Sequence, residues 1–235
     1  SYGDAVGNQV LSLQRLLRGM GYRSQAFSER APLASEGRAR EITHYPRAGS
    51  PDGTLLLHYS LGYSPRVLDW LSQVPDRKVL VYHNITPPEY FRGVQEQTAH
   101  LLARGRQQAK ALAGTAEVVM ADSRFNAEEI AAMGHANPQV LPLMLDFSLL
   151  RGKPDRGIQR RYRDGMANLL FVGRCAPNKR IEDLLNAFYY FQNYVQPASR
   201  LIHVGSTAGM EQYHALLLTR VRELQLKNVE IAGAA

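Results

Sequence analysis

The amino-acid sequence predicts an α/β protein with parallel sheets. Short apolar runs, each long enough for one strand, alternate with longer stretches in which apolar residues recur at the helical period. This alternation is typical of βαβ units, in which a helix connects two parallel strands. Apolar residues make up 45% of the 235 residues and charged residues 21%. That composition can bury a core, and it argues against disorder, collagen and coiled coil.

The first half of the chain contains four strand candidates and the helices between them. A first helix is expected over residues 7–20 and a long one over 94–112. Ser64 followed by proline predicts a capped helix start, and Asn126 with Glu129 predicts another through a capping box. The strand candidates are Thr54–Tyr59, Lys78–His83, Glu117–Ala121 and Gln139–Leu143.

The second half begins after a polar, basic stretch over residues 148–166, which contains three glycines and a proline and suits an interdomain linker. The expected domains are therefore 1–147 and 167–235. Both are expected to be incomplete, because the first opens without a strand and the second contains about three. Strands are expected at Asn168–Val172, Leu201–Val204 and Val229–Ile231, with helices over 181–191 and 209–226.

The net charge of +7 is concentrated in one region. Residues 151–180 hold nine basic and two acidic side chains, which suits binding to phosphate, nucleic acid or anionic lipid, or a solvated linker. Binding to nucleic acid is disfavoured, because aromatic residues do not alternate with the basic residues and no known nucleic-acid-binding motif occurs. The single Cys175 cannot form an internal disulfide, and no apolar run reaches the roughly 20 residues that span a bilayer. We expect a cytoplasmic protein, with contact to the inner face of the membrane as an open alternative.

One loop in the second half combines features of an anion site. The run Phe171-Val-Gly-Arg-Cys-Ala-Pro-Asn-Lys-Arg places Gly173, Arg174 and Lys179 between a buried strand and the next helix. The end of a parallel strand and the start of the following helix favour bound phosphate. The alternative is that Arg174 pairs with a carboxylate and Lys179 is solvated. Gly205 and Ser206 follow another strand and offer backbone N–H groups to phosphates, or form a plain turn.

In the first half, polar residues again follow apolar runs. His83 ends one strand candidate and Asn84 follows it, while His58 lies one residue before the end of another, so these side chains are expected at the edge of the sheet where ligands bind. A strand-end histidine can equally be a structural hydrogen-bonding group. Gly3, Gly7 and Asn8 precede the first helix, but glycine spacing alone is weak evidence. No histidine or cysteine cluster has the spacing of metal ligands.

These segments together resemble glycosyltransferase family 4, retaining enzymes with the two-domain GT-B fold. The Gly-Arg…Lys loop resembles the family's diphosphate-binding element. The run Tyr82-His-Asn-Ile-Thr-Pro-Pro-Glu-Tyr-Phe resembles the segment whose histidine reaches the donor sugar. Gly3–Asn8 resembles the N-terminal glycine loop that faces the interdomain cleft, and Ala121–Asn126 resembles a segment that usually reads Asn-Ser before a helix. The resemblance covers nearly the whole chain, in the same order.

The resemblance implies metal-independent transfer of a hexosyl group from a UDP or GDP sugar to a hydroxyl on a glycan or lipid-linked glycan, as in polysaccharide biosynthesis. Arg174 and Lys179 would stabilise the leaving diphosphate and His83 would contact the donor sugar; no cofactor is expected. The family's pair of glutamates separated by seven intervening residues (E-x7-E) does not follow the last expected strand of this sequence. A non-catalytic nucleotide-sugar or glycan-binding fragment, or another GT-B enzyme such as a sugar phosphorylase, therefore remains an alternative. The expected substrate-binding residues are Gly3, Gly7, Asn8, His58, Asn84, Gly173, Gly205 and Ser206.

Overall fold

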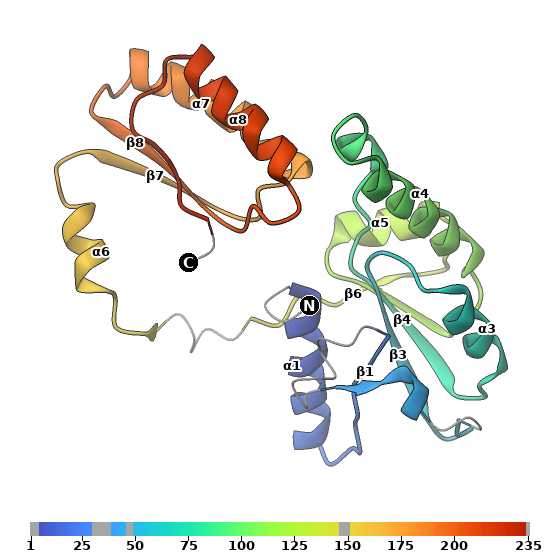
Figure 1. Ribbon diagram of the computed structural model, residues 1–235. Coiled ribbons are helices and arrows are strands. Elements are labelled where there is room, and N and C mark those ends of the chain that lie inside the picture. Colours follow the sequence, from blue (N-terminus) through green and yellow to red (C-terminus); the bar gives the residue numbers. More distant parts are fainter. Residues whose placement is uncertain (1–4, 30–38, 46–48, 146–150, 234–235) are drawn as a thin grey trace. The chain divides into compact units, whose positions relative to one another are not determined.

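The chain folds as two compact units, each built around a parallel sheet. The computed structural model describes residues 5–29, 39–45, 49–145 and 151–233. Unit 1 consists of Ser1–Pro87 and His100–Phe147, and unit 2 consists of Pro88–Ala99 and Ser148–Ala235. The order of elements is strand, helix, strand throughout most of each unit (Figure 1).

The main sheet of unit 1 has four parallel strands in the order β3-β4-β5-β6. Their bounds are β3 (Thr54–Tyr59), β4 (Arg77–Tyr82), β5 (Val118–Ala121) and β6 (Gln139–Val140). Because all three pairings are parallel, the carboxyl ends of the four strands lie at one edge of the sheet. The sixth residues of β3 and β4, Tyr59 and Tyr82, are paired in register, and Tyr82 pairs with Ala121.

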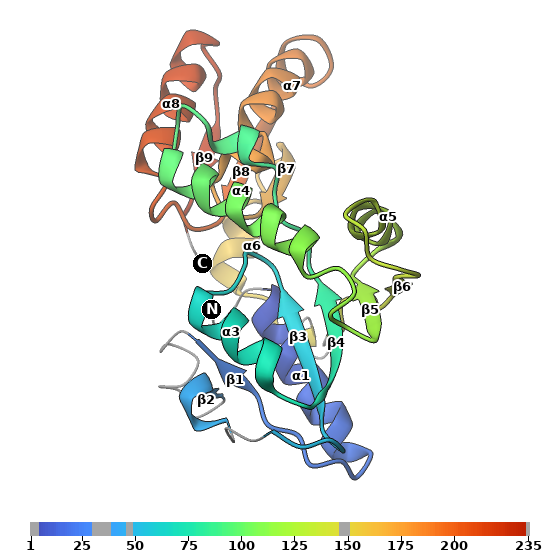
Figure 2. The same cartoon turned by 90° about the vertical axis from the view of Figure 1, so that its right-hand side faces the viewer.

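Among the described residues, four helices accompany this sheet. They are α1 (Ala5–Gly19), α3 (Pro65–Gln73), α4 (Glu96–Ala111) and α5 (Arg124–Ala132). Helix α1 lies on one face of the sheet, and α3 and the unit 1 part of α4 lie on the other (Figure 2). A two-residue parallel ladder, β1 (Phe27–Ser28) with β2 (Arg40–Glu41), and a 3-10 turn η1 (Ile42–His44) lie between α1 and β3 in sequence.

The helix starts follow from local side-chain chemistry. Ser64 caps α3 by accepting a hydrogen bond from the Val67 backbone, with proline in the first turn, as the sequence predicts. At α5 the expected capping box is wrong. The cap is Ser123, whose hydroxyl accepts a hydrogen bond from the Asn126 backbone N–H. The Glu129 side chain instead accepts a hydrogen bond from the Asn84 amide. Ser123 precedes Asn126 by three residues, so the capping pattern was present but placed one turn too late.

The core of unit 1 is formed by apolar strand residues and the helix faces that cover them. In helix α1 the buried residues are Gly7, Gln9 and Gln14 rather than large apolar side chains, and Met20, expected within the helix, is 62% exposed beyond its end. Gln9 is buried at 1% exposure and accepts a hydrogen bond from the Met144 backbone at 2.6 Å. The Gln9 side-chain oxygen thus has a polar partner inside the unit, whereas the amide nitrogens of Gln9 and Gln14 are buried without one among the described residues.

Unit 2 contains a three-stranded parallel sheet in the order β7-β8-β9. Its strands are β7 (Ala167–Val172), β8 (Ser199–Val204) and β9 (Val229–Ile231), and its helices are α6 (Arg156–Arg161), α7 (Ile181–Tyr194) and α8 (Glu211–Glu223). Helices α7 and α8 cover one face of the sheet (Figure 1). The fully buried part of this core comprises Cys175, Ile181, Leu185, Phe188, Leu201, Tyr213 and Leu217.

Two further segments are fixed to unit 2. The 3-10 turn η2 (Pro88–Phe91) contacts a second 3-10 turn, η4 (Pro177–Lys179), and Val94 packs against the core. The region expected to be a solvated linker is partly anchored as well. Arg161 forms an ion pair with Glu230 at 2.8 Å, and the Tyr162 hydroxyl donates to the same carboxylate at 2.9 Å. Residues 161–162 are thereby held against the last strand.

Candidate functional site

Three polar side chains stand in a row at the carboxyl edge of the unit 1 sheet. His58 is the penultimate residue of β3, His83 directly follows β4, and Asp122 directly follows β5. Nδ1 of His58 lies 2.8 Å from Nε2 of His83, and Nδ1 of His83 lies 2.9 Å from a carboxylate oxygen of Asp122. The three adjacent parallel strands therefore bring the three side chains into one hydrogen-bonded chain. The sequence predicted two of its members, His58 and His83, and missed Asp122.

The members of this chain differ in exposure. The His83 side chain is 1% exposed and that of Asp122 is 12% exposed. Both ring nitrogens of His83 are engaged, one by His58 and the other by Asp122. The direct contact between His83 and a donor sugar that the resemblance implies stays a prediction, and in this structure the ring is enclosed by its two neighbours.

His58 is held in its neutral form. Burial, with a smaller contribution from the adjacent His83, lowers the pKa of His58 from 6.5 to about 3. Its backbone carbonyl accepts a hydrogen bond from the Tyr63 hydroxyl at 3.0 Å. The two imidazole rings are nearly coplanar, with an angle of 12° between their planes. Coplanar rings suit a hydrogen bond that runs in the plane of both.

The turn after β4 is fixed by a second network centred on Glu129. Asn84 has a left-handed backbone (φ 66°), and its amide donates to the side chains of Asn126 and Glu129 at 3.0 and 3.1 Å. The Tyr82 hydroxyl donates to Glu129 at 2.5 Å, and Arg106 forms an ion pair with it at 2.9 Å. Burial and the hydrogen bond to Glu129 raise the pKa of Tyr82. The amide nitrogen of Asn84 is thus committed to the fold, and the role of Asn84 in substrate binding stays a prediction.

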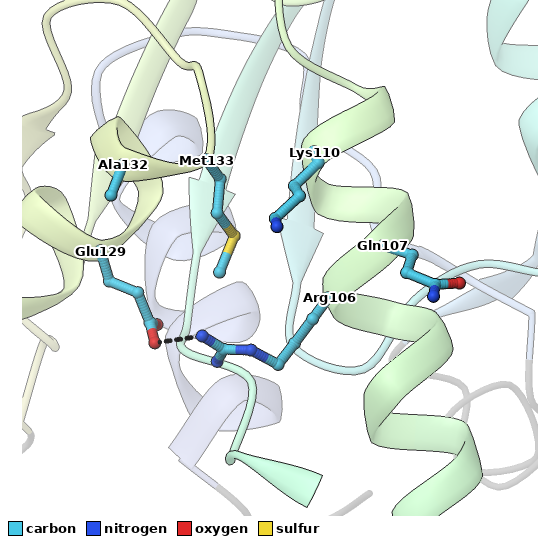
Figure 3. A pocket seen from close by; sticks show the side chains of 6 residues that line it. All are labelled: Arg106, Gln107, Lys110, Glu129, Ala132 and Met133. Atoms are coloured by element: carbon cyan, nitrogen blue, oxygen red, sulfur yellow. Dashed lines mark ion pairs between the residues drawn. The ribbon is translucent and has the colours of Figure 1, made fainter.

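A small cavity adjoins this network. It measures about 280 Å³ and lies between α4 and α5, with the Arg106–Glu129 ion pair on its wall (Figure 3). Lys110 points toward Met133 from the α4 side, whereas Gln107 is turned away (Figure 3). A larger hollow of about 490 Å³ lies between α3 and α4 and is mainly apolar. It is lined by Leu57, Leu68, Leu71, Ser72, Lys78, Gln108, Ala111, Leu112 and Thr115.

The expected glycine loop, Gly3–Asn8, is helical from Ala5 onward, where α1 begins. Gly3 lies outside the described residues. Gly7 is buried and Asn8 exposed, both in the first turn of α1. The assignment of Gly7 and Asn8 to substrate binding stays a prediction.

In unit 2, the expected phosphate loop presents two unpaired cations. Arg174 and Lys179 are both exposed, and neither side chain has a hydrogen-bond or ion-pair partner among the described residues. The alternative in which Arg174 pairs with a carboxylate is therefore not seen in this part of the chain. Arg180 differs, because it forms ion pairs with Glu182 and Asp183 in the first turn of α7.

The loop that carries Arg174 is joined to the loop after β8 by close backbone contacts. A Cβ atom on Gly205 would lie 1.8 Å from the Gly173 carbonyl oxygen, so no other residue fits there. The same oxygen is 2.8 Å from Nε2 of His203, and the Cys175 backbone donates to the Ser206 carbonyl at 3.0 Å. The structure thus brings Gly173, Gly205 and Ser206 together. His203 was not singled out from sequence, although its place in β8 next to a glycine offered a signal.

The start of α7 departs from the expected anion site. The backbone N–H of Ile181 donates to the Tyr213 hydroxyl, which in turn donates to Glu182. Two acidic side chains, Glu182 and Asp183, occupy the first turn. These partners occupy the helix N-terminus and offset its positive charge, which leaves Arg174 and Lys179 as the unpaired positive groups of this loop among the described residues.

The described residues form neither a metal-binding cluster nor a membrane-spanning helix. No group of three or more histidine, cysteine, aspartate or glutamate side chains in this part of the chain is arranged to hold a metal ion. Within the same residues, no helix has the length and apolar character needed to cross a lipid bilayer.

Comparison with known proteins identifies the architecture. No protein-family profile matches the sequence, and no curated protein matches it. Solved structures do match, among them sucrose-phosphate synthase from Thermosynechococcus elongatus, with a TM-score of 0.59 and 20% sequence identity. The fold is that of part of a GT-B glycosyltransferase. The match covers 77% of this chain and 45% of the synthase chain. The predicted α/β class with two Rossmann-like parallel-sheet domains is confirmed.

Proposed function

We propose that this chain is part of a retaining glycosyltransferase of family 4 type. It transfers a hexosyl group from a nucleotide-diphosphate sugar to a hydroxyl of a glycan or lipid-linked glycan. The GT-B fold and the order of the sequence motifs support this proposal. The observation that carries it is the pair of exposed, unpaired cations on the loop after β7, Arg174 and Lys179.

The proposed chemistry places these cations on the leaving group. The bond between the anomeric carbon and the β-phosphate oxygen breaks, and negative charge grows on that oxygen. Arg174 can hold the diphosphate through its planar fork, while Lys179 adds a compact positive charge. Together they take the part that a metal ion plays in other sugar transferases. The acceptor hydroxyl forms the new bond to the anomeric carbon, and its proton passes to the departing phosphate oxygen.

Binding of diphosphates and monophosphates to the full chain tests the proposal directly. Thermal shift and calorimetry with UDP, UMP, GDP and GMP should show stabilisation by one nucleotide diphosphate through mass action. Removing a charge-assisted hydrogen bond costs about 1.5–3 kcal/mol, so Arg174→Ala should weaken diphosphate binding about 10- to 100-fold. Monophosphate binding should change much less, because the β-phosphate is absent.

Arg163→Ala provides the matched control, because Arg163 is an exposed arginine without a side-chain partner among the described residues of the same unit. It should leave the preference for diphosphate unchanged, whereas Lys179→Ala should reduce it. Equal binding of UDP and UMP, or an equal loss in Arg163→Ala and Arg174→Ala, would refute the assigned role.

A second candidate is a nucleotide-sugar-binding module without catalysis. It is compatible with the same observation, since the unpaired Arg174 and Lys179 can hold a diphosphate whether or not a sugar is transferred. Nucleotide binding does not separate the two functions. They are separated by measuring the release of UDP or GDP from the sugar donor with and without a glycan acceptor. An enzyme shows acceptor-dependent release, and a binding module shows none.

A further inference from the structure

The hydrogen-bonded row of side chains at the carboxyl edge of the unit 1 sheet has donors and acceptors in a defined order. It runs from Asp122 through His83 to His58, across three strands that lie side by side in the sheet (Figure 2). Oδ2 of Asp122 faces the His83 ring, while Oδ1 is buried without a hydrogen-bond partner in the part of the chain that the structure describes. His83 is therefore the side chain on which the carboxylate of Asp122 acts.

The direction of the hydrogen bonds follows from the carboxylate. An ionised carboxylate only accepts, so Nδ1 of His83 carries the proton and donates it to Asp122. In the neutral ring, Nε2 of His83 is then an acceptor, and the proton between the two histidines belongs to Nδ1 of His58. By the same reasoning, Nε2 of a neutral His58 carries no proton.

This last nitrogen is the open end of the chain. Nε2 of His58 has no hydrogen-bond partner among the described residues, and it does not belong to their buried, unsatisfied polar atoms. His58 itself is partly exposed. His83, in contrast, is enclosed, with both nitrogens engaged. A ligand at this edge therefore meets a bare nitrogen of His58 that can accept a hydrogen bond.

We propose that His58 contacts the substrate by accepting a hydrogen bond from a sugar hydroxyl at Nε2, and that His83 and Asp122 are positioning residues that fix its ring and tautomer. The proposal rests on the proposed function, because it takes the ligand to be a sugar. It assigns the contact to His58, where the sequence resemblance assigned it to His83. The low pKa of His58 agrees with this part, since a ring that stays neutral keeps the bare nitrogen at physiological pH.

Nitrogen-15 spectra of the histidine rings in the full chain test the tautomers without any ligand. His58→Gln and His83→Gln assign the signals. In the wild type, His58 and His83 should both carry the proton on Nδ1. In Asp122→Ala the Nδ1–H preference of His83 should fall about tenfold or more, because a hydrogen bond to a charged acceptor is lost, and His58 should become a mixture. Asp52→Ala, which removes an exposed carboxylate without a partner among the described residues, should change neither ring.

Asp122→Asn guards against a trivial loss of folding. Its amide oxygen can still accept from His83, so it should restore part of the tautomer preference while circular dichroism matches the wild type. A proton on Nε2 of His58 in the wild type, or unchanged tautomers in a folded Asp122→Ala chain, would overturn the assignment.

The substrate contact is tested with UDP-glucose and GDP-mannose against UDP and GDP. A sugar donor should move the Nε2 resonance of His58, and the diphosphate alone should not. Movement at His83 without movement at His58 would overturn the contact. If no nucleotide or nucleotide sugar binds, the proposed function fails and the substrate contact with it. The tautomers measured without ligand still decide whether Asp122 and His83 position His58.

Discussion

His58 links the chemistry of the sheet edge to the stability of unit 1. The folded chain holds its pKa near 3, against 6.5 for an ordinary histidine, mainly because the ring is buried and secondarily because His83 adjoins it. Between these two values the unfolded chain binds the proton and the folded chain does not. The free energy of unfolding should therefore fall as the pH is lowered, by about 2 kcal/mol between pH 7 and pH 5 from this group.

Urea denaturation of the wild type and His58→Gln at these two pH values measures this contribution. Other groups titrate in both proteins, so the difference between them isolates His58. His100→Gln is the control, because His100 is exposed and has no partner among the described residues. The free energy of unfolding of this variant should fall between pH 7 and pH 5 by as much as that of the wild type. An equal pH dependence in wild type and His58→Gln would contradict the proposed burial of a neutral ring.

At the level of single residues, the sequence singled out candidate site residues that lie at or just after the end of a strand. His58, His83, Arg174 and Gly205 all follow or end apolar runs, and ligands bind at that edge of parallel sheets. Asp122 also follows a strand, so the same rule could have found it. Glu129 could not be found that way. It lies within α5, and its importance comes from contacts with Tyr82, Asn84 and Arg106, which the fold alone brings near.

At the level of elements, the junction between the loops after β7 and β8 depends on the absence of a side chain. In Gly205→Ala the new methyl group would overlap the Gly173 carbonyl, which is backbone and cannot rotate away. Relief requires the two loops to separate, which would also disturb the hydrogen bond from Cys175 to Ser206. The substitution should lower the free energy of unfolding by about 1–3 kcal/mol and reduce diphosphate binding.

The matched control is Gly152→Ala, because a Cβ at Gly152 meets no atom within 4 Å. Its stability should stay within about 0.5 kcal/mol of the wild type. Urea denaturation and UDP or GDP titration of both variants provide the measurement. A stable Gly205→Ala chain with unchanged diphosphate binding would show that the close approach of the loops is not required.

The strands were the elements that sequence predicted best. Five of the seven expected strands differ from the observed ones by no more than one residue at either end. They are apolar runs of a length that suits a strand buried between layers. The two larger errors have a common cause, which is the hydrogen-bonded pairing between neighbouring strands. The strand expected at 139–143 ends at Val140, where its partner β5 also ends, and the strand expected at 201–204 begins at Ser199, opposite Ala167 of β7. Hydrogen-bonded pairing with a neighbouring strand sets those bounds, and the apolar pattern of one strand carries no information about its partner.

At the scale of the whole molecule, the structure divides the excess positive charge into paired and unpaired groups. Arg161 and Arg180 have carboxylate partners, and Arg200 is held by Asp164 and Glu230. Within the described residues around α6, the exposed basic side chains without a carboxylate partner remain available to an anionic surface. They are Arg151, Lys153, Arg156, Arg160 and Arg163. A lipid-linked acceptor would make attraction to anionic membrane useful, which is a proposal that charge density alone supports.

Co-sedimentation of the full chain with vesicles tests this proposal. Each basic residue near an anionic surface contributes about 1 kcal/mol, so the double variant Arg156→Ala/Arg163→Ala should bind phosphatidylserine-containing vesicles about 25-fold more weakly at low salt. The double variant Arg66→Ala/Arg104→Ala removes the same charge from exposed positions in unit 1 and should bind as the wild type does. Salt near 0.5 M should abolish binding in all three, because the Debye length then falls to roughly 4 Å. Equal losses in the two double variants would assign the attraction to net charge and not to α6, and no binding at low salt would end the membrane proposal.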